Sequence, residues 1–135
     1  SNLMIKNKKL CLIDSQDAVF GNIAYDLASL IDDVRLKTSK RFKQDIFEEY
    51  IKTNKKIHIE NFKNDFEILS VLRNLKIIGI FTRLSFRDKK HNYLKLIPYA
   101  WKLIEQRTEK NKKFIELKTI LDKYFSQKKR IKYEN

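Results

Sequence analysis

The stretch LCLIDSQDAVFGNIAYDLASLIDD, residues 10–33, decides the fold because the chain changes there from strand to helix. Its first four residues form an apolar strand pattern that stops at Asp14, and a second acid, Asp17, follows three positions later. From Asn22 onward the pattern is helical, and we expect Asn22 to cap a helix that runs to about Val34. The stretch therefore predicts a carboxylate at the open end of a strand, followed at once by a helix.

The spacing of apolar residues predicts which side of this helix faces the core. The residues that recur at helical spacing are Ile23, Leu27, Leu30 and Ile31. Asp26 lies between Tyr25 and Leu27, so we expect its side chain to be at least partly buried. A buried carboxylate needs hydrogen-bond donors, which makes Asp26 a candidate for a structural contact.

Residues 1–14 precede this helix and predict a β-hairpin. Two short apolar runs, LMI and LCLI, flank the polar turn Lys6–Lys9. A two-stranded ribbon is marginal in water when it stands alone. We therefore expect the hairpin to pack on the helices or on more protein.

Residues 22–126 predict a helical subdomain. Ser39 is expected to cap a second helix, and the longest helix is expected from about Ile59 to Phe86. Because its middle is apolar nearly all round, we expect other helices to enclose it, with Gly79 at a close helix contact. Pro98 suits the first turns of the next helix, and a narrow apolar stripe predicts a docked last helix. The fold class is mainly α, with about five helices and a short N-terminal β-hairpin.

The composition limits the class of protein. The 135 residues are 42% hydrophobic, as in a globular domain, and carry a formal charge of +13. The lysines occur in pairs at turns and helix ends, so biased codon usage and solvated surfaces explain the charge better than a nucleic-acid partner. A single cysteine, Cys11, suits a reducing cytoplasm, and no apolar run is long enough to span a membrane.

Two blocks of the sequence resemble a known family. LIDSQDAVFGNIAYDLASLIDD is similar to the segment of aminoglycoside and choline kinase-like phosphotransferases in which a strand ends at the metal-binding Asp. LKIIGIFTRLSFRDKKHNYLKLIP, at 75–98, is similar to a later block of the subgroup of anomeric N-acetylmuramate and N-acetylglucosamine kinases. The blocks occur in the family's order. Ser15 departs from the pattern where an aromatic residue is usual, and Asn22 departs where proline is usual.

The resemblance implies a metal site at the open end of the hairpin. Asp14 matches the metal-binding Asp, and Asn2 matches the second ligand, at the end of the catalytic loop. Mg²⁺ prefers such hard oxygen donors, and ATP would be the cosubstrate in the full-length protein. One alternative stays open, namely that Ser1-Asn2 is the remnant of a cleaved tag.

The resemblance also suggests roles for three further residues. Asp17 and Arg83 could contact the substrate, although Asp17 could equally cap a turn and Arg83 could pair with a nearby carboxylate. Asp26 matches an Asp that braces the catalytic loop by hydrogen bonds, which is a structural role. No catalytic residue is assigned within the chain, because the expected base lies upstream of Ser1.

The resemblance and the missing parts together predict a fragment. With only two glycines we expect no phosphate-binding loop within these residues, and we expect the ATP-binding N-lobe to belong to sequence upstream of Ser1. We expect residues 1–135 to be the C-terminal lobe, in a protein-kinase-like fold, of an ATP-dependent phosphotransferase that acts on an amino sugar. Alone it should be inactive and should self-associate through the exposed hairpin edge. The alternative is a basic helical module that binds nucleic acid or another anionic partner.

Overall fold

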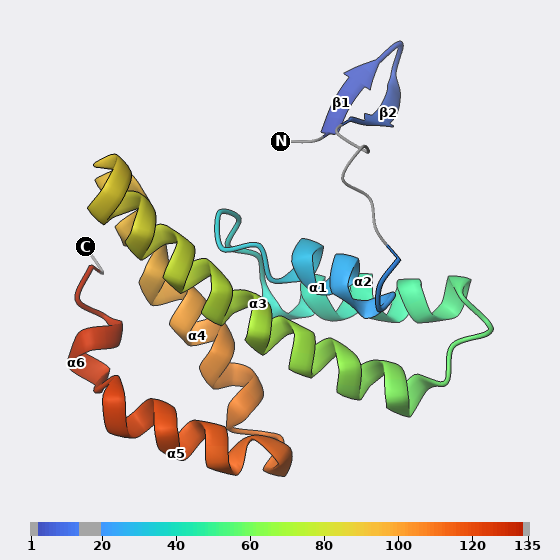
Figure 1. The fold of residues 1–135 in the computed structure, drawn as a ribbon. Helices are drawn as coiled ribbons and strands as arrows, with labels where there is room; N and C mark the ends of the chain where they lie inside the picture. Colours follow the sequence, from blue (N-terminus) through green and yellow to red (C-terminus); the bar gives the residue numbers. More distant parts are fainter. Residues whose placement is uncertain (1–2, 14–19, 134–135) are drawn as a thin grey trace.

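The computed structural model describes residues 3–13 and 20–133 and shows helices joined to one small hairpin (Figure 1). The predicted fold class is confirmed. The strands are β1 (Leu3–Lys6) and β2 (Lys9–Leu12). The helices are α1 (Ala24–Ile31), α2 (Lys40–Thr53), α3 (Ile59–Asp88), α4 (Ile97–Thr108), α5 (Ile115–Tyr124) and α6 (Gln127–Arg130), with 3-10 turns η2 (His91–Leu96) and η3 (Lys112–Phe114).

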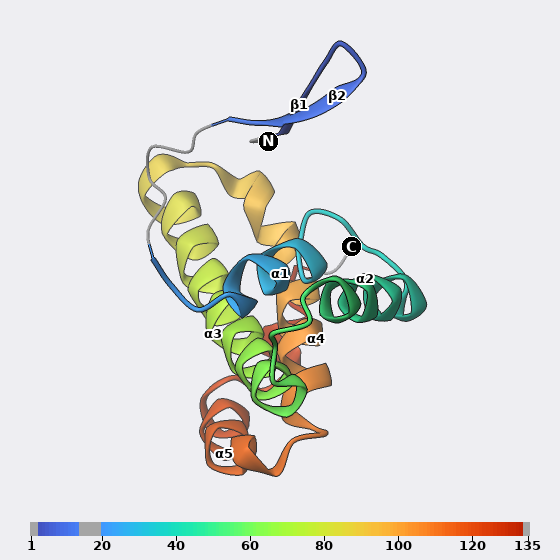
Figure 2. The ribbon, with the colours of Figure 1, turned by 90° about the vertical axis from the view of Figure 1, so that its right-hand side faces the viewer.

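The hairpin forms where the sequence predicts it. Its strands are antiparallel with Lys6 opposite Lys9, and the two turn residues, Asn7 and Lys8, have φ values of 50° and 61°. Two left-handed residues are the geometry that matches the twist of a tight hairpin. The hairpin stands apart from the helices (Figures 1 and 2), and the opposed Ile5 and Leu10 are 78% and 69% exposed. In the described part of the chain it does not pack on the helices, so its contact with more protein stays a prediction.

Local sequence signals set the helix boundaries. The Ser39 hydroxyl accepts a hydrogen bond from the backbone N–H of Phe42 at 3.1 Å, which caps α2 as predicted. Pro98 lies in the first turn of α4, where its missing N–H has no helical partner to lose. The long helix α3 ends at Asp88, and Lys89 turns the chain with φ of 56°.

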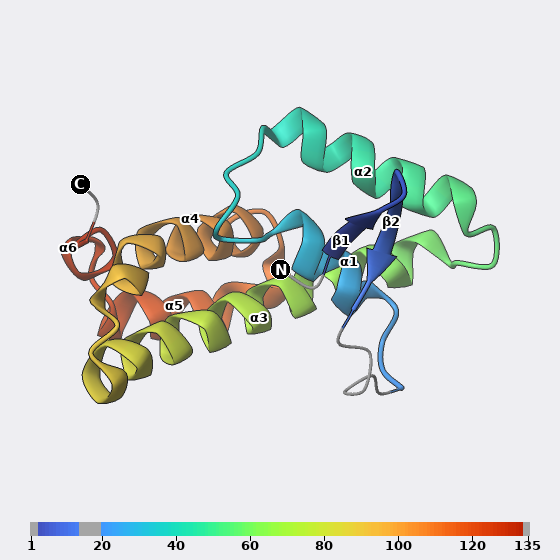
Figure 3. The same ribbon diagram turned by 90° about the horizontal axis from the view of Figure 1, so that it is seen from above.

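Two clusters of buried residues form the core, and α3 contributes to both. The cluster near the first turns of α3 contains Ala24, Leu27, Ala28, Ile31, Phe62 and Phe66. The other contains Val34, Val71, Phe81, Ile97, Ala100, Trp101, Leu103, Ile104, Phe114 and Leu121. Figure 3 shows α3 passing along the helical body, with α1 and α2 toward one end and α4 and α5 toward the other. The helix therefore sets the spacing between the two clusters.

The buried face of α1 includes Leu27 and Ile31, as predicted, but not Ile23 and Leu30. Ala24 and Ala28 are fully buried against α3, whereas Ile23 and Leu30 are 57% and 61% exposed. The two alanines let α1 lie close to α3. The buried face is therefore centred about one residue away from the face that the largest apolar residues of α1 suggest. Asp26 is consequently exposed, and the prediction that it is at least partly buried was wrong.

Three expectations about α3 and α5 also need correction. Among the described residues, neighbouring helices do not fully enclose the middle of α3, because Leu72 is 55% exposed. Gly79 faces open space, since a Cβ atom at this position would meet no other segment of the described residues within 4 Å, so it marks no close helix contact. On α5 only part of the apolar stripe docks, since Leu121 is buried and Ile120 is 54% exposed.

Candidate functional site

The predicted metal ligands Asn2 and Asp14 lie outside the described residues, as does Asp17. Their position in the sequence can still be related to the hairpin. Asn2 directly precedes β1, and Asp14 follows the end of β2 by two positions. The strand register pairs the first residue of β1 with the last residue of β2, so both predicted ligands adjoin the same open end in sequence. Their role stays a prediction.

Asn22 anchors the start of α1 where the chain leaves the acidic stretch. Its Oδ1 accepts a hydrogen bond from the backbone N–H of Ala24 at 2.9 Å, and its Nδ2 donates to Oδ2 of Asp65 at 2.7 Å. The first contact satisfies a free N–H of the helix start, and the second ties α1 to α3. Asn22 thus both caps the backbone at the start of α1 and ties α1 to α3.

A cleft of about 780 Å³ lies next to this anchor. It is bounded by the start of α1, the turn between α2 and α3 and the first turns of α3. Asn22, His58 and Asp65 supply polar groups to its wall, and Ile57 and Phe62 supply apolar surface. The cleft brings together side chains that the sequence pattern did not group.

Arg83 and Asp26 are both exposed, on α3 and α1 respectively. No hydrogen bond or ion pair within residues 3–13 and 20–133 joins the two side chains, so the structure does not bring them together. Arg87, on the last turn of α3, pairs with Asp88 at 2.7 Å. That local pairing is the ordinary behaviour of an exposed helix arginine.

The acid that is buried is Asp32, which directly follows α1 and is fully inaccessible to solvent. Its Oδ1 accepts a hydrogen bond from Lys43 Nζ of α2 at 2.9 Å. Its Oδ2 accepts from Ser70 Oγ of α3 at 2.5 Å and from Arg107 Nη2 of α4 at 3.0 Å. The backbone carbonyl of Asp32 also accepts from Arg73 at 3.3 Å. One carboxylate therefore links the end of α1 to three other helices.

The surroundings of Asp32 keep it ionised. Burial alone would raise the pKa of this carboxyl group, but Arg107, the Ser70 hydrogen bond and Lys43 outweigh it and lower the pKa below its ordinary value of 3.8. The two cations also lie on aromatic rings, with Arg107 4.9 Å from the ring centre of Phe66. A buried charge of this kind is tolerated because each oxygen has donors.

The spacing of the alanines in the sequence indicates that Asp32 is buried, but the larger apolar residues of α1 dominate the helical pattern. Ala24, Ala28 and position 32 are four residues apart and lie on one helix face, whereas position 26 belongs with Ile23 and Leu30. Giving alanine the same weight as leucine in the helical pattern would have selected Asp32 as the buried acid. Small residues mark the side on which helices approach most closely.

Within residues 3–13 and 20–133, no three His, Cys, Asp or Glu side chains gather closely enough to hold a metal ion. In the same ranges, no helix combines the length and apolar character that crossing a bilayer requires.

Comparison with known proteins relates the chain to sugar kinases. No protein-family model matches the sequence. The N-acetylmuramate/N-acetylglucosamine kinase of Neisseria meningitidis serogroup B is 35% identical over 103 residues, which covers 72% of this chain and 31% of the relative. The enzyme of the same name from Caulobacter vibrioides is 32% identical over 90 residues, covering 67% of this chain and 25% of the relative. The one from Pseudomonas aeruginosa is 29% identical over 126 residues, covering 89% and 37%.

The chain spans about a third of the length of these curated relatives. The alignments cover between two thirds and nine tenths of this chain. These similarities support a relationship between this chain and the amino-sugar kinases.

Proposed function

We propose that residues 1–135 are the C-terminal lobe of an ATP-dependent phosphotransferase that acts on an amino sugar. The observation that carries the proposal is the identity of 29–35% to three kinases that are named for N-acetylmuramate and N-acetylglucosamine. Because the chain spans about a third of those proteins, the remaining two thirds would supply the ATP-binding lobe and the catalytic base. On this proposal the lobe has no activity alone.

Asn2 and Asp14 are proposed as ligands of Mg²⁺. Their amide and carboxylate oxygens are hard donors, which suits the ion, and the hairpin register brings the chain segments that adjoin them to one end. When bound, the ion would neutralise charge on the phosphates of ATP. The hairpin would hold the two ligands at a common edge. Asn22 would fix the point at which the segment containing Asp14 and Asp17 joins α1.

The exposed side of α1, which we call its outer face, is formed by Ile23, Asp26 and Leu30. We propose that upstream sequence covers this face in the whole protein, with Asp26 bracing the catalytic loop. Support comes from the exposure of Ile23 and Leu30, at 57% and 61%, on either side of an exposed carboxylate. A contact there would bury apolar surface and would supply Asp26 with donors. Asp17 and Arg83 are proposed as substrate contacts.

The test uses a longer chain that includes the natural upstream sequence. With ATP and Mg²⁺ it should phosphorylate N-acetylglucosamine or N-acetylmuramate, measured as release of ADP. Asp14→Ala should abolish turnover because a metal ligand is lost. Asp45→Ala, which removes an exposed carboxylate from α2, is the matched control and should leave turnover unchanged. Turnover in the Asp14→Ala variant equal to that of the control would disprove the ligand assignment.

The brace is tested in the same longer chain. Asp26→Asn should lower kcat more than it changes the KM for the sugar, because the residue would orient the catalytic loop without touching substrate. An unchanged kcat with a raised KM would instead place Asp26 in sugar binding.

A further inference from the structure

A second cleft, of about 720 Å³, lies between the start of α2, the first turns of α4 and the C-terminal segment that contains α6. We call it the lysine cleft. The cations that line it are Lys37, Lys40, Lys43, Lys95, Lys102 and Arg130. Glu105 is the one carboxylate among its described lining residues. The tertiary structure thus gathers cations that the sequence scatters over more than ninety positions.

Two of these cations already have partners. Lys43 pairs with Asp32 at 2.9 Å, and Arg130 pairs with Glu105 at 2.9 Å. The other four lysines make no ion pair with a carboxylate of the described residues. Several ammonium groups around one cavity repel each other, and a bound anion relieves that repulsion.

Aromatic rings form the apolar part of the wall. The Nζ atoms of Lys37 and Lys43 each lie 5.5 Å from the ring centre of Tyr99. Trp101 is 4% exposed and packs against the guanidinium of Arg130, whose Cζ lies 4.9 Å from the ring centre. Trp101 is therefore covered by Arg130, and the half-buried ring of Tyr99 is the aromatic surface that lies beside the positive charge of the cleft. An aromatic surface next to cations suits a ring that carries an anionic group.

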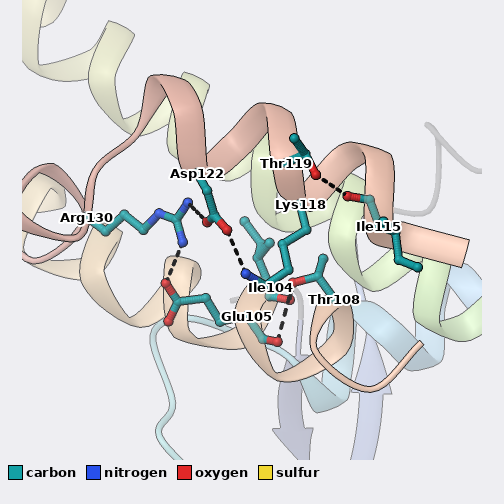
Figure 4. A network of polar contacts seen from close by, with 8 residues as sticks. All are labelled: Ile104, Glu105, Thr108, Ile115, Lys118, Thr119, Asp122 and Arg130. Carbon is teal, nitrogen blue, oxygen red and sulfur yellow. Dashed lines mark hydrogen bonds and ion pairs between the residues drawn. The ribbon is translucent and has the colours of Figure 1, made fainter. Parts of the chain in front are cut away.

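The C-terminal wall of the cleft is held in place by ion pairs, which Figure 4 shows. Arg130 Nη1 contacts Oε1 of Glu105 on α4 at 2.9 Å, and its Nη2 contacts Oδ1 of Asp122 on α5 at 2.6 Å. Lys118 holds the other oxygen of Asp122 at 2.6 Å. Because Arg130 is only 7% exposed, these contacts fix α6 against α4 and α5.

We propose that the lysine cleft binds a small molecule that carries a phosphate group. Its volume lies within the range of small-molecule sites, about 300–1,000 Å³. Its cations converge on a cavity, whereas a nucleic-acid backbone would need them spread along a stripe. The proposal is independent of the phosphotransferase role, since neither the hairpin nor the outer face of α1 lines this cleft.

Trp101 is the single tryptophan of the chain, so its fluorescence reports on the cleft directly. The chain of 135 residues is titrated with glucose 1-phosphate, and with glucose as the uncharged control. The phosphate ester should change the emission saturably with a 1:1 stoichiometry, and glucose should not. An equal response to glucose, or no saturable response to the ester, would overturn the proposal.

Charge variants show whether the response comes from these lysines. Lys40→Glu combined with Lys102→Glu should weaken binding of glucose 1-phosphate at least about tenfold, since each lysine that is lost removes a charge-assisted contact. Lys55→Glu combined with Lys56→Glu changes the net charge equally at the turn between α2 and α3, away from the cleft, and should leave the affinity unchanged. Equal weakening in both double variants would mean that binding follows net charge, which would overturn the proposal. Because Lys40 and Lys102 are exposed, folding should survive, and Lys40→Gln with Lys102→Gln gives a milder second test.

A polymer is the rival ligand. A single-stranded oligonucleotide of about 20 nucleotides should bind more weakly than glucose 1-phosphate at about 0.15 M salt. Tighter binding of the oligonucleotide, with an affinity that falls steeply as salt rises, would overturn the small-molecule proposal and favour a nucleic-acid partner.

Discussion

The two sides of α1 differ more than their sequences suggest. The side toward α3 carries Ala24, Ala28 and, just beyond the helix, the buried Asp32 with four hydrogen-bonded partners. The outer face carries Asp26 between two exposed apolar residues. Two acids six positions apart therefore have opposite environments. The difference shows that one short helix can join the body of the lobe on one side and offer surface to other protein on the other.

The largest expected difference between the two sides of α1 appears when each acid is replaced by its amide. Asp32→Asn should lower the free energy of unfolding by about 3 kcal/mol, because Lys43 and Arg107 would keep their charges without a carboxylate. Lys43 and Arg107 have side chains 11% and 26% exposed, so solvent limits the loss to the lower part of the range for buried pairs. Asp26→Asn is the matched control and should change stability by less than about 0.5 kcal/mol. Urea unfolding measures both, and equal losses would contradict the assignment of the buried side.

A change of side-chain size sharpens the same comparison. Ala28→Leu should destabilise the protein by about 1–3 kcal/mol, because a fully buried alanine at a close helix contact leaves no room for a larger side chain. Leu30→Ala, on the outer face, should change stability by no more than about 0.5 kcal/mol. Urea unfolding measures both variants. A larger loss of unfolding free energy for Leu30→Ala than for Ala28→Leu would mean that Leu30 belongs to the buried face, as the sequence pattern predicted.

The pH dependence separates the buried acid from the exposed ones. The pKa of Asp32 is lower in the folded protein than its ordinary value of 3.8, so its contribution to stability is complete above about pH 4 and is lost as pH falls through the folded-state pKa. Asp33, whose pKa is also lowered, mainly by its hydrogen bond to Arg35, adds a loss in the same direction. The gap in unfolding free energy between the unmodified chain and Asp32→Asn isolates the Asp32 part. It should narrow as pH falls below about 4, and a gap that widened would contradict the sign.

The smallest effect on stability is expected from a substitution in the hairpin. Like the outer face of α1, the hairpin exposes apolar residues that no other described segment covers. We expect the chain to self-associate through this ribbon, and Ile5→Lys should reduce that association because it places a charge on the exposed apolar face. Unfolding of the helical body should change by less than about 0.5 kcal/mol. Ile120→Lys, on an exposed part of α5, is the control. Sedimentation equilibrium that finds the unmodified chain monomeric at high concentration would refute the association.

Much of the fold follows from signals that act over a few residues. The hairpin turn, the Ser39 cap, the position of Pro98 and the length of α3 all appear where the sequence predicts them. Each depends on backbone geometry or on a hydrogen bond to a nearby N–H, so neighbouring residues are enough to specify it. The burial of Asp26 and the packing of Gly79 were mispredicted, because both depend on which helix lies nearby.

By itself, the sequence determined the hairpin and its turn, the order of the main helices and the similarity to sugar kinases. Only the tertiary structure decided which side of α1 is buried, that Asp32 receives donors from α2, α3 and α4, and that lysines from separate segments converge on one cleft. The physical reason is that local hydrogen bonds fix elements, whereas burial and charge clustering depend on side chains brought together from distant positions.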